Sequence, residues 1–192
     1  MKYISVFCGS SSGNEKVFTE QARLLGQTIA RRGGYGVVYG GAHVGLMGAV
    51  ASGALSEGGE VIGVIPEFLK KKELEYKNLT QMYVVDTMHE RKAKMNELSD
   101  AVIALPGGYG TMEELFEILT WGQLALHRKP VGLLDIDGFY EPLIAMSEKM
   151  IEKGFLKEEY RDLLIVDDKI DLLLKKMEAF VPLINDKWFE VT

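Results

Sequence analysis

The sequence has few of the residues from which disulfide frameworks and metal sites are built. Its 192 residues include one cysteine, Cys8, and three histidines, His43, His89 and His127. A single cysteine cannot cross-link the chain to itself. The histidines are widely separated and belong to no HExxH or CxxC pattern. We therefore expect neither a disulfide framework nor a metal site.

Long apolar runs and blocks of positive charge are missing as well. No apolar run approaches the ~20 residues that cross a bilayer, and we expect the N-terminal segment, residues 1–7, to contribute a strand that no signal peptide precedes. The net charge is −6, whereas a protein that wraps nucleic acid needs a basic face to neutralise phosphates. The sequence thus predicts a cytoplasmic protein that binds neither membranes nor nucleic acid. An acidic chain can still hold a small phosphorylated ligand with one basic residue and a helix end.

Short apolar segments rich in β-branched residues alternate with amphipathic segments along the whole chain. Such alternation is typical of an α/β protein whose parallel sheet has helices on both faces. No repeat or flexible linker divides the sequence, so we expect one domain over residues 1–192. The expected strands cover residues 4–7, 37–39, 61–65, 82–85, 101–105, 131–134 and, weakly, 163–166. The expected helices cover residues 15–32, 46–55, 88–98, 140–153 and 169–180, and one more runs from the turn at 106–111 to about 126. Residues 67–78 are expected to form a loop or a short ragged helix.

Two predicted strands end in glycine-rich turns that lead into helices, where parallel-sheet enzymes bind ligands. In the first turn, residues 40–48, Gly45 and Gly48 lie one helical step apart, so tight packing explains the turn as well as ligand binding does. An acidic ribose partner is also not evident, because Glu60 precedes the next strand instead of ending it. The first turn by itself is a weak signal.

The second turn is a stronger signal for anion binding. It places Gly107, Gly108 and Gly110 between a buried strand and a helix N-terminus. Free backbone amides and the positive end of the helix dipole would face a phosphate above the turn. One alternative stays open, since Thr111 and Glu114 have the spacing of a capping box, in which Glu114 would only cap the helix.

Arg91 lies on the apolar stripe of its predicted helix, together with Met88, Met95 and Leu98. Thr87, before this helix, has capping-box spacing to Glu90. Burying an unpaired guanidinium costs several kcal/mol, so a buried Arg91 needs a carboxylate or a phosphate. The alternative is that its side chain extends past the methionines to solvent.

The helix of Arg91 and the second glycine turn both follow the carboxyl ends of strands. They should therefore open on the same edge of the sheet. Arg91 and Glu114 would then face one crevice, with a basic and an acidic group around a phosphate. This pair favours an enzyme over a passive fold.

At these positions the sequence resembles the LOG phosphoribohydrolases, a family once often labelled lysine decarboxylases. Residues 106–114 fit its PGGxGTxxE motif at every fixed position, and residues 88–92 resemble its second motif. Residues 40–48 resemble its first glycine loop, with Ala42 where a third glycine is common. The similarity covers about residues 4–153, and three spaced motifs in order make it specific.

The resemblance implies a Rossmann-like homodimer that needs no metal or organic cofactor. It would hydrolyse the N-glycosidic bond of a nucleoside 5′-monophosphate and release free base and ribose 5-phosphate. N6-prenylated AMP is the typical substrate of the family, and AMP is often a poorer one. Arg91 and Glu114 would be the catalytic pair. Substrate contacts are implied for Glu73, Lys92, Gly107, Gly108, Tyr109, Gly110, Thr111, Met112, Glu113 and Thr120.

The residues also bear on two other functions. A pyridoxal phosphate decarboxylase needs a Schiff-base lysine in a cofactor pocket, and no lysine here has a distinctive setting. A non-catalytic nucleotide carrier or sensor would use the same glycine turn. It has little need of a carboxylate such as Glu114 beside a phosphate, because the two repel each other. Hydrolysis is therefore the preferred prediction, and the carrier is the alternative.

Overall fold

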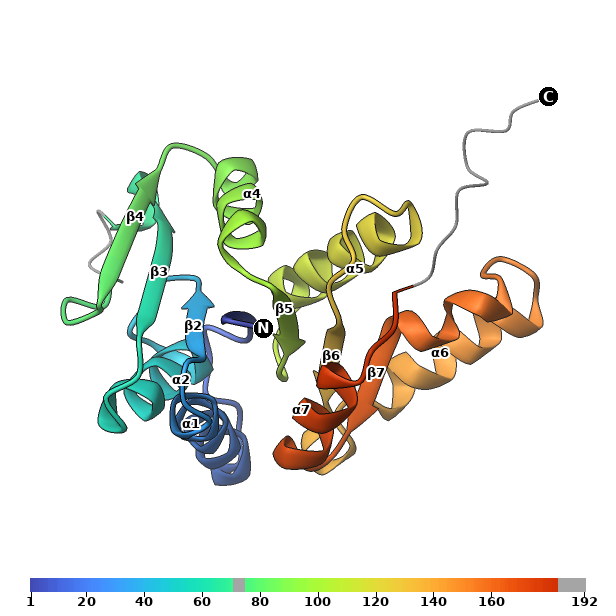
Figure 1. Cartoon of the computed structure of the whole chain (residues 1–192), viewed down its shortest axis with the longest axis horizontal. Helices are drawn as coiled ribbons and strands as arrows, with labels where there is room; N and C mark the ends of the chain where they lie inside the picture. The colour runs from blue at the N-terminus through green and yellow to red at the C-terminus, as the bar shows by residue number, and fades with distance from the viewer. Residues whose placement is uncertain (71–74, 183–192) are drawn as a thin grey trace.

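One seven-stranded sheet organises the chain. The computed structural model describes residues 1–70 and 75–182. All strand pairs of the sheet are parallel, in the order β4-β3-β2-β1-β5-β6-β7 (Figure 1). The strands are β1 (Tyr3–Phe7), β2 (Gly36–Tyr39), β3 (Val61–Pro66), β4 (Gln81–Val85), β5 (Ala101–Ala104), β6 (Val131–Leu134) and β7 (Leu164–Asp167). This confirms the predicted parallel sheet.

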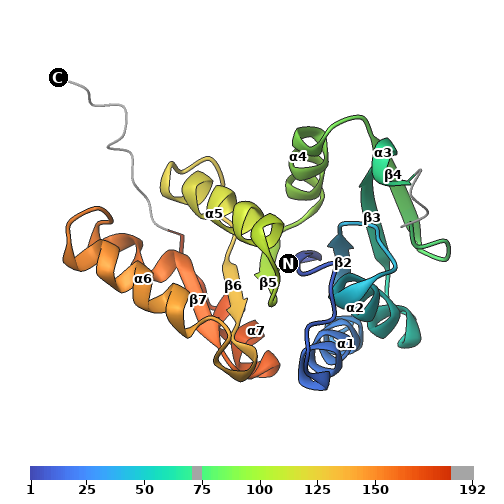
Figure 2. The same ribbon diagram turned by 180° about the vertical axis from the view of Figure 1, so that it is seen from behind.

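Helices cover both faces of the sheet, as predicted. One core holds residues of α1 (Lys16–Arg31), α2 (Gly45–Ser56) and α7 (Ile170–Glu178), and the other holds residues of α4 (Met88–Leu98), α5 (Tyr109–Gln123) and α6 (Glu141–Glu152). Val37 and Tyr39 of β2 face the first core and Val38 faces the second, because side chains alternate along a strand. Figures 1 and 2 show α1, α2 and α7 below the sheet and α4 and α5 above it.

The short elements differ most from the sequence prediction. Residues 67–78, expected to be a loop or a ragged helix, contain α3 (Glu67–Lys70), and residues 71–74 lie outside the described part. Two 3₁₀-helices were not predicted, η1 (Ile136–Gly138) and η2 (Glu158–Leu163). The weakly predicted last strand is present as β7. Short 3₁₀ segments carry little periodic signal, which explains why the pattern missed them.

The strand order creates a crevice between β1 and β5. The chain adds strands on one side of β1 up to β4, and then returns to the other side of β1 with β5. The segments after these two strands lead to helices on opposite faces of the sheet, α1 and α5. Where they leave the sheet, the N–H of Gly9 donates to the carbonyl of Pro106 at 3.0 Å. Ligands of open parallel sheets bind at such a switch point, outside the carboxyl ends of the strands.

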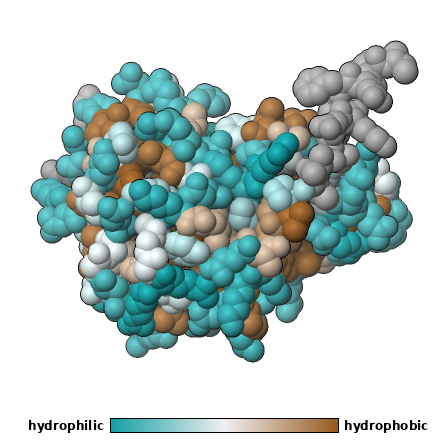
Figure 3. Space-filling view, in the orientation of Figure 1, coloured by the Kyte–Doolittle hydropathy of each residue, from teal (hydrophilic) through white to brown (hydrophobic). Residues whose placement is uncertain are grey.

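Within residues 1–70 and 75–182, no helix combines the length and the hydrophobicity that crossing a bilayer requires. The face drawn in Figure 3 is largely hydrophilic, and its apolar side chains form separate patches.

Candidate active site

Side-chain hydrogen bonds cap the start of α4. The hydroxyl of Thr87 accepts a hydrogen bond from the N–H of Glu90 at 3.1 Å, which confirms the predicted capping pattern. The carboxylate of Glu90 accepts from the N–H of Asp86 at 2.9 Å, one residue before the cap. One donor that the helix start leaves free, the N–H of Glu90, is thus satisfied, and so is the N–H just before the cap. The following residue, Arg91, is thereby held against the sheet.

Arg91 is buried and paired. Only 9% of its surface is exposed, so the alternative in which its side chain extends to solvent is wrong. Its Nε–H donates to the carbonyl of Val64 in β3, at 3.2 Å. Its Nη1 lies 3.4 Å from Oε1 of Glu114. The predicted anionic partner of the guanidinium is therefore a protein carboxylate in this structure.

Glu114 faces the crevice instead of capping its helix. Helix α5 begins at Tyr109 with Gly108 as its N-cap, and no side chain caps it. The capping box considered for Thr111 and Glu114 is therefore wrong, because the helix already starts two residues before Thr111. Burial raises the pKa of Glu114, although the neighbouring Arg91 opposes the rise. The carboxyl is 8% exposed and is directed at the guanidinium.

The second glycine turn leaves room for a ligand at the start of α5. A side chain at Gly107 would lie 2.1 Å from the hydroxyl oxygen of Thr111, so this position requires glycine. A Cβ at Gly108 or Gly110 would meet nothing within 4 Å. These two residues therefore present an open backbone at the positive end of the helix dipole, as the anion-binding prediction requires.

Both glycine turns border one crevice of about 370 Å³. In the first turn, one glycine is required for packing and another for the position of Arg91. A side chain at Gly48 would approach the carbonyl oxygen of His43 to 2.0 Å, which is a packing constraint, whereas one at Gly40 would approach Nη2 of Arg91 to 1.9 Å. The crevice is lined by Cys8, Gly9, Ser10, Gly40, Ala42, Val44, Met47, Ile65, Leu69, Arg91, Gly108, Tyr109, Gly110, Thr111 and Glu114.

Some lining residues were not predicted to be part of the site. Cys8 follows β1 and lies beside Arg91 and Glu114, and burial strongly raises the pKa of its thiol, which remains protonated. Met47, Ile65 and Leu69 add apolar walls. Their positions just after strand ends were the available signal, since those ends define the ligand edge of a parallel sheet.

Other predicted contacts lie away from this crevice. Lys92 pairs with Glu113 and Glu117, and Met112 packs against the core that includes α5. The hydroxyl of Thr120 donates to the carbonyl of Phe116 at 2.7 Å. Gly107 lies in the turn, closely packed against Thr111 and Gly9, and Glu73 lies outside the described residues. Substrate contacts for these residues remain predictions.

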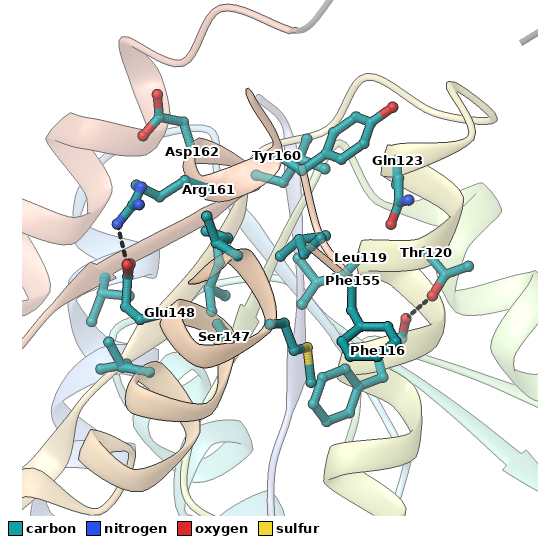
Figure 4. A pocket seen from close by; sticks show the side chains of 17 residues that line it. Phe116, Leu119, Thr120, Gln123, Ser147, Glu148, Phe155, Tyr160, Arg161 and Asp162 are labelled. Carbon is teal, nitrogen blue, oxygen red and sulfur yellow. Dashed lines mark hydrogen bonds and ion pairs between the residues drawn. The ribbon is translucent and has the colours of Figure 1, made fainter. Parts of the chain in front are cut away.

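Thr120 borders a second cavity of about 440 Å³ between α5, α6 and η2. Figure 4 shows Thr120 and Phe116 on one wall, with Glu148 and Arg161 joined by an ion pair on another. Phe155, also in its lining, is 87% exposed. This cavity is apolar for the most part and contains neither member of the Arg91–Glu114 pair.

Fold and crevice together define an α/β protein with an anion-compatible helix start and a buried arginine–glutamate pair at the switch point of its sheet. A family model described as "Possible lysine decarboxylase" matches residues 47–177. The chain is 49% identical to the probable cytokinin riboside 5′-monophosphate phosphoribohydrolase LOGL1 of Oryza sativa subsp. japonica, over 92% of this chain and 79% of that protein. It is 43% identical to the cytokinin riboside 5′-monophosphate phosphoribohydrolase LOG2 of Arabidopsis thaliana, over 95% of this chain and 85% of that one. The chain belongs to the LOG phosphoribohydrolase family.

Solved structures agree with the Rossmann-like fold. The molybdenum cofactor binding protein of Rippkaea orientalis has a TM-score of 0.69 at 24% identity and covers 92% of this chain and 95% of its own. The molybdenum cofactor carrier protein of Chlamydomonas reinhardtii has a TM-score of 0.68 at 22% identity, over 93% and 98%. Similarity at this level of identity concerns the fold alone.

Proposed function

We propose that this chain hydrolyses the N-glycosidic bond of AMP and of N6-prenylated AMP, releasing the free base and ribose 5-phosphate. The observation that carries the proposal is the buried pair of Arg91 and Glu114, 3.4 Å apart, beside an open glycine turn. The names of the LOG relatives from rice and Arabidopsis specify cytokinin riboside 5′-monophosphates as their substrates, which supports the same substrate class here.

The 5′-phosphate would bind over the first turn of α5. Gly108 and Gly110 have no atoms within 4 Å of where a side chain would begin, so an anion can approach their backbone closely. Tyr109 and Thr111 complete this wall of the crevice. A phosphate at a helix N-terminus gains from both free amide groups and the helix dipole.

Glu114 would act on the ribose. Cleavage of the C1′–N9 bond develops positive charge on the sugar, as in other glycosyl transfers. A carboxylate can stabilise that charge or remove a proton from the attacking water, whose oxygen becomes bonded to C1′. The bond electrons leave with the base, which takes up a proton. Because burial raises the pKa of Glu114, its carboxylate is a stronger base than an exposed one.

Arg91 would act on a different part of the substrate from Glu114. Its guanidinium is fixed by Val64 on one side and Glu114 on the other, so little rotamer freedom remains to be lost on binding. It can donate to the phosphate or to the departing purine. Among the described residues that line the crevice, Arg91 is the one cation, and no lysine is available there for a Schiff base.

We also propose that the protein is a homodimer. Phe155 and Phe116, 87% and 40% exposed, expose apolar surface along the cavity between α5 and α6. Apolar patches of this kind often mark protein interfaces. Sedimentation equilibrium tests this directly, and a monomer at micromolar concentration would contradict it.

Incubation with AMP and with N6-isopentenyl-AMP tests the function. The expected products, detected by chromatography, are free base and an equal amount of ribose 5-phosphate. Glu114→Gln serves as the matched control, since it keeps the size of the side chain and loses the carboxylate. Tight nucleotide binding by calorimetry with no release of base would instead indicate a carrier. Absence of both binding and a thermal shift would exclude these ligands altogether.

A further inference from the structure

Lys92 is a buried lysine that lies outside the crevice. It follows Arg91 on α4, is 9% exposed, and points toward α5. Its ammonium donates hydrogen bonds to Glu113 and, at 3.0 Å, to Oε1 of Glu117. Burial disfavours the charged ammonium, but these two carboxylates outweigh it and raise the pKa of Lys92. The side chain is therefore a fixed positive charge whose nearest partners are on α5.

Glu114 lies between the crevice and Lys92. It lines the crevice, and it also lines a small space of about 10 Å³ on the inner side of α5, together with Lys92 and Glu117. The carboxyl of Glu114 thus has one cation on the crevice side and a second one behind it. The charged and titratable groups that face it are Arg91 and Lys92 from α4, Glu113 and Glu117 from α5, and the Cys8 thiol after β1.

We infer that Lys92 is a positioning residue for Glu114 and acts on it from behind, without touching the substrate. By pairing with Glu113 and Glu117 it ties the second and third turns of α5 to α4. It also offsets the two negative charges that flank Glu114 on its own helix. This inference rests on the proposed function, in which Glu114 works as a carboxylate.

The charges around Glu114 predict a measurable consequence. Burial raises the pKa of Glu114, Arg91 lowers it, Glu113 raises it and Lys92 lowers it again, with a further rise from Glu117. Removing the positive charge of Lys92 should therefore raise this pKa, and removing the negative charge of Glu117 should lower it. A side chain that only fills space would produce neither shift.

The test compares Lys92→Met with Lys94→Met. Lys94 lies on the same helix but pairs with Glu97 at 3.1 Å, so it is a matched control for loss of a lysine charge. In the pH dependence of kcat/KM for AMP, Lys92→Met should shift the acidic limb upward on the order of half a pH unit, with KM changed less than threefold. Lys94→Met should leave the limb in place. Glu117→Gln should shift it downward.

Two results would overturn the inference. A tenfold rise in KM with an unmoved limb would mean that Lys92 contacts the substrate, and identical limbs for Lys92→Met and Lys94→Met would mean that its charge does not reach Glu114. If Lys92→Met fails to fold, Glu117→Gln provides the test by itself. An acidic limb of kcat/KM that stays at the wild-type pH in Glu117→Gln then contradicts the proposal. Carboxyl ¹³C NMR of Glu114, assigned with Glu114→Gln, gives the same shift without turnover. A protein that releases no base therefore refutes the proposed function while still testing Lys92.

Discussion

Gly40 offers the sharpest prediction, because one methyl group there would displace the guanidinium of Arg91. A Cβ at Gly40 would lie 1.9 Å from Nη2 and 3.1 Å from Cζ of Arg91. Ordinary contact begins near 3.4 Å, so the guanidinium must withdraw by about 1.5 Å. The backbone of Gly40 does not have a positive φ, so alanine introduces no strain of its own.

The expected loss of activity is larger than a loss of folded protein would explain. The clashing atoms belong to side chains and not to the backbone, and overpacking of this kind typically costs about 1–3 kcal/mol. Misplacing a catalytic group by about 1 Å costs about 10²-fold in rate, which corresponds to about 2.7 kcal/mol in the activation barrier. Gly40→Ala should therefore still fold, with a melting temperature lowered by about 2–12 °C, and lose about 10²-fold in kcat/KM for AMP.

The assay is release of adenine from AMP, with Gly122→Ala as a control. Gly122 lies near the end of α5, where the nearest atom to a new Cβ is a ring carbon of His127 at 3.3 Å, and alanine there should leave turnover unchanged. A double mutant then tests whether the loss of activity arises through Arg91. In an Arg91→Met background, Gly40→Ala should cost less than about threefold, since the residues act as one unit. Wild-type kinetics for Gly40→Ala, or an undiminished loss in that background, would refute the reasoning.

Three further predictions concern the pair itself. Glu114→Gln should bind AMP within about threefold of the wild type but lose about 10³-fold in kcat, measured by calorimetry and by release of base; retained turnover would remove Glu114 from the mechanism. Arg91→Met should weaken both AMP binding and kcat, and near-native kinetics would show that the guanidinium is dispensable. Arg91→Met should also destabilise the fold at pH 7 by about 3–5 kcal/mol, because the carboxylate of Glu114 is left buried without a partner. The raised pKa of Glu114 means that the folded state holds its proton more tightly than the unfolded state. The loss of stability caused by Arg91→Met should therefore shrink as the pH falls below the folded pKa of Glu114. A loss of stability that does not depend on pH, measured by calorimetric melting, would contradict the assignment.

The sequence by itself determined the alternation of elements and the burial of Arg91. Strand and helix periods depend on residues a few positions apart, so they can be counted along the chain. The apolar stripe that includes Met88 and Met95 predicted a buried arginine, and Arg91 is 9% exposed. The glycine turn at residues 106–111 was likewise predicted with its helix, and its open backbone is present in the structure.

The tertiary structure decided which groups meet. The capping box considered for Thr111 and Glu114 failed because α5 starts earlier, after Gly108. Neither the contact of Gly40 with Arg91 nor the pairing of Lys92 with Glu113 and Glu117 has a signature in spacing, because each joins segments at least 21 residues apart in the chain. Such contacts arise only when the strands have taken their places in the sheet, since the order of the strands determines which loops face each other across the crevice.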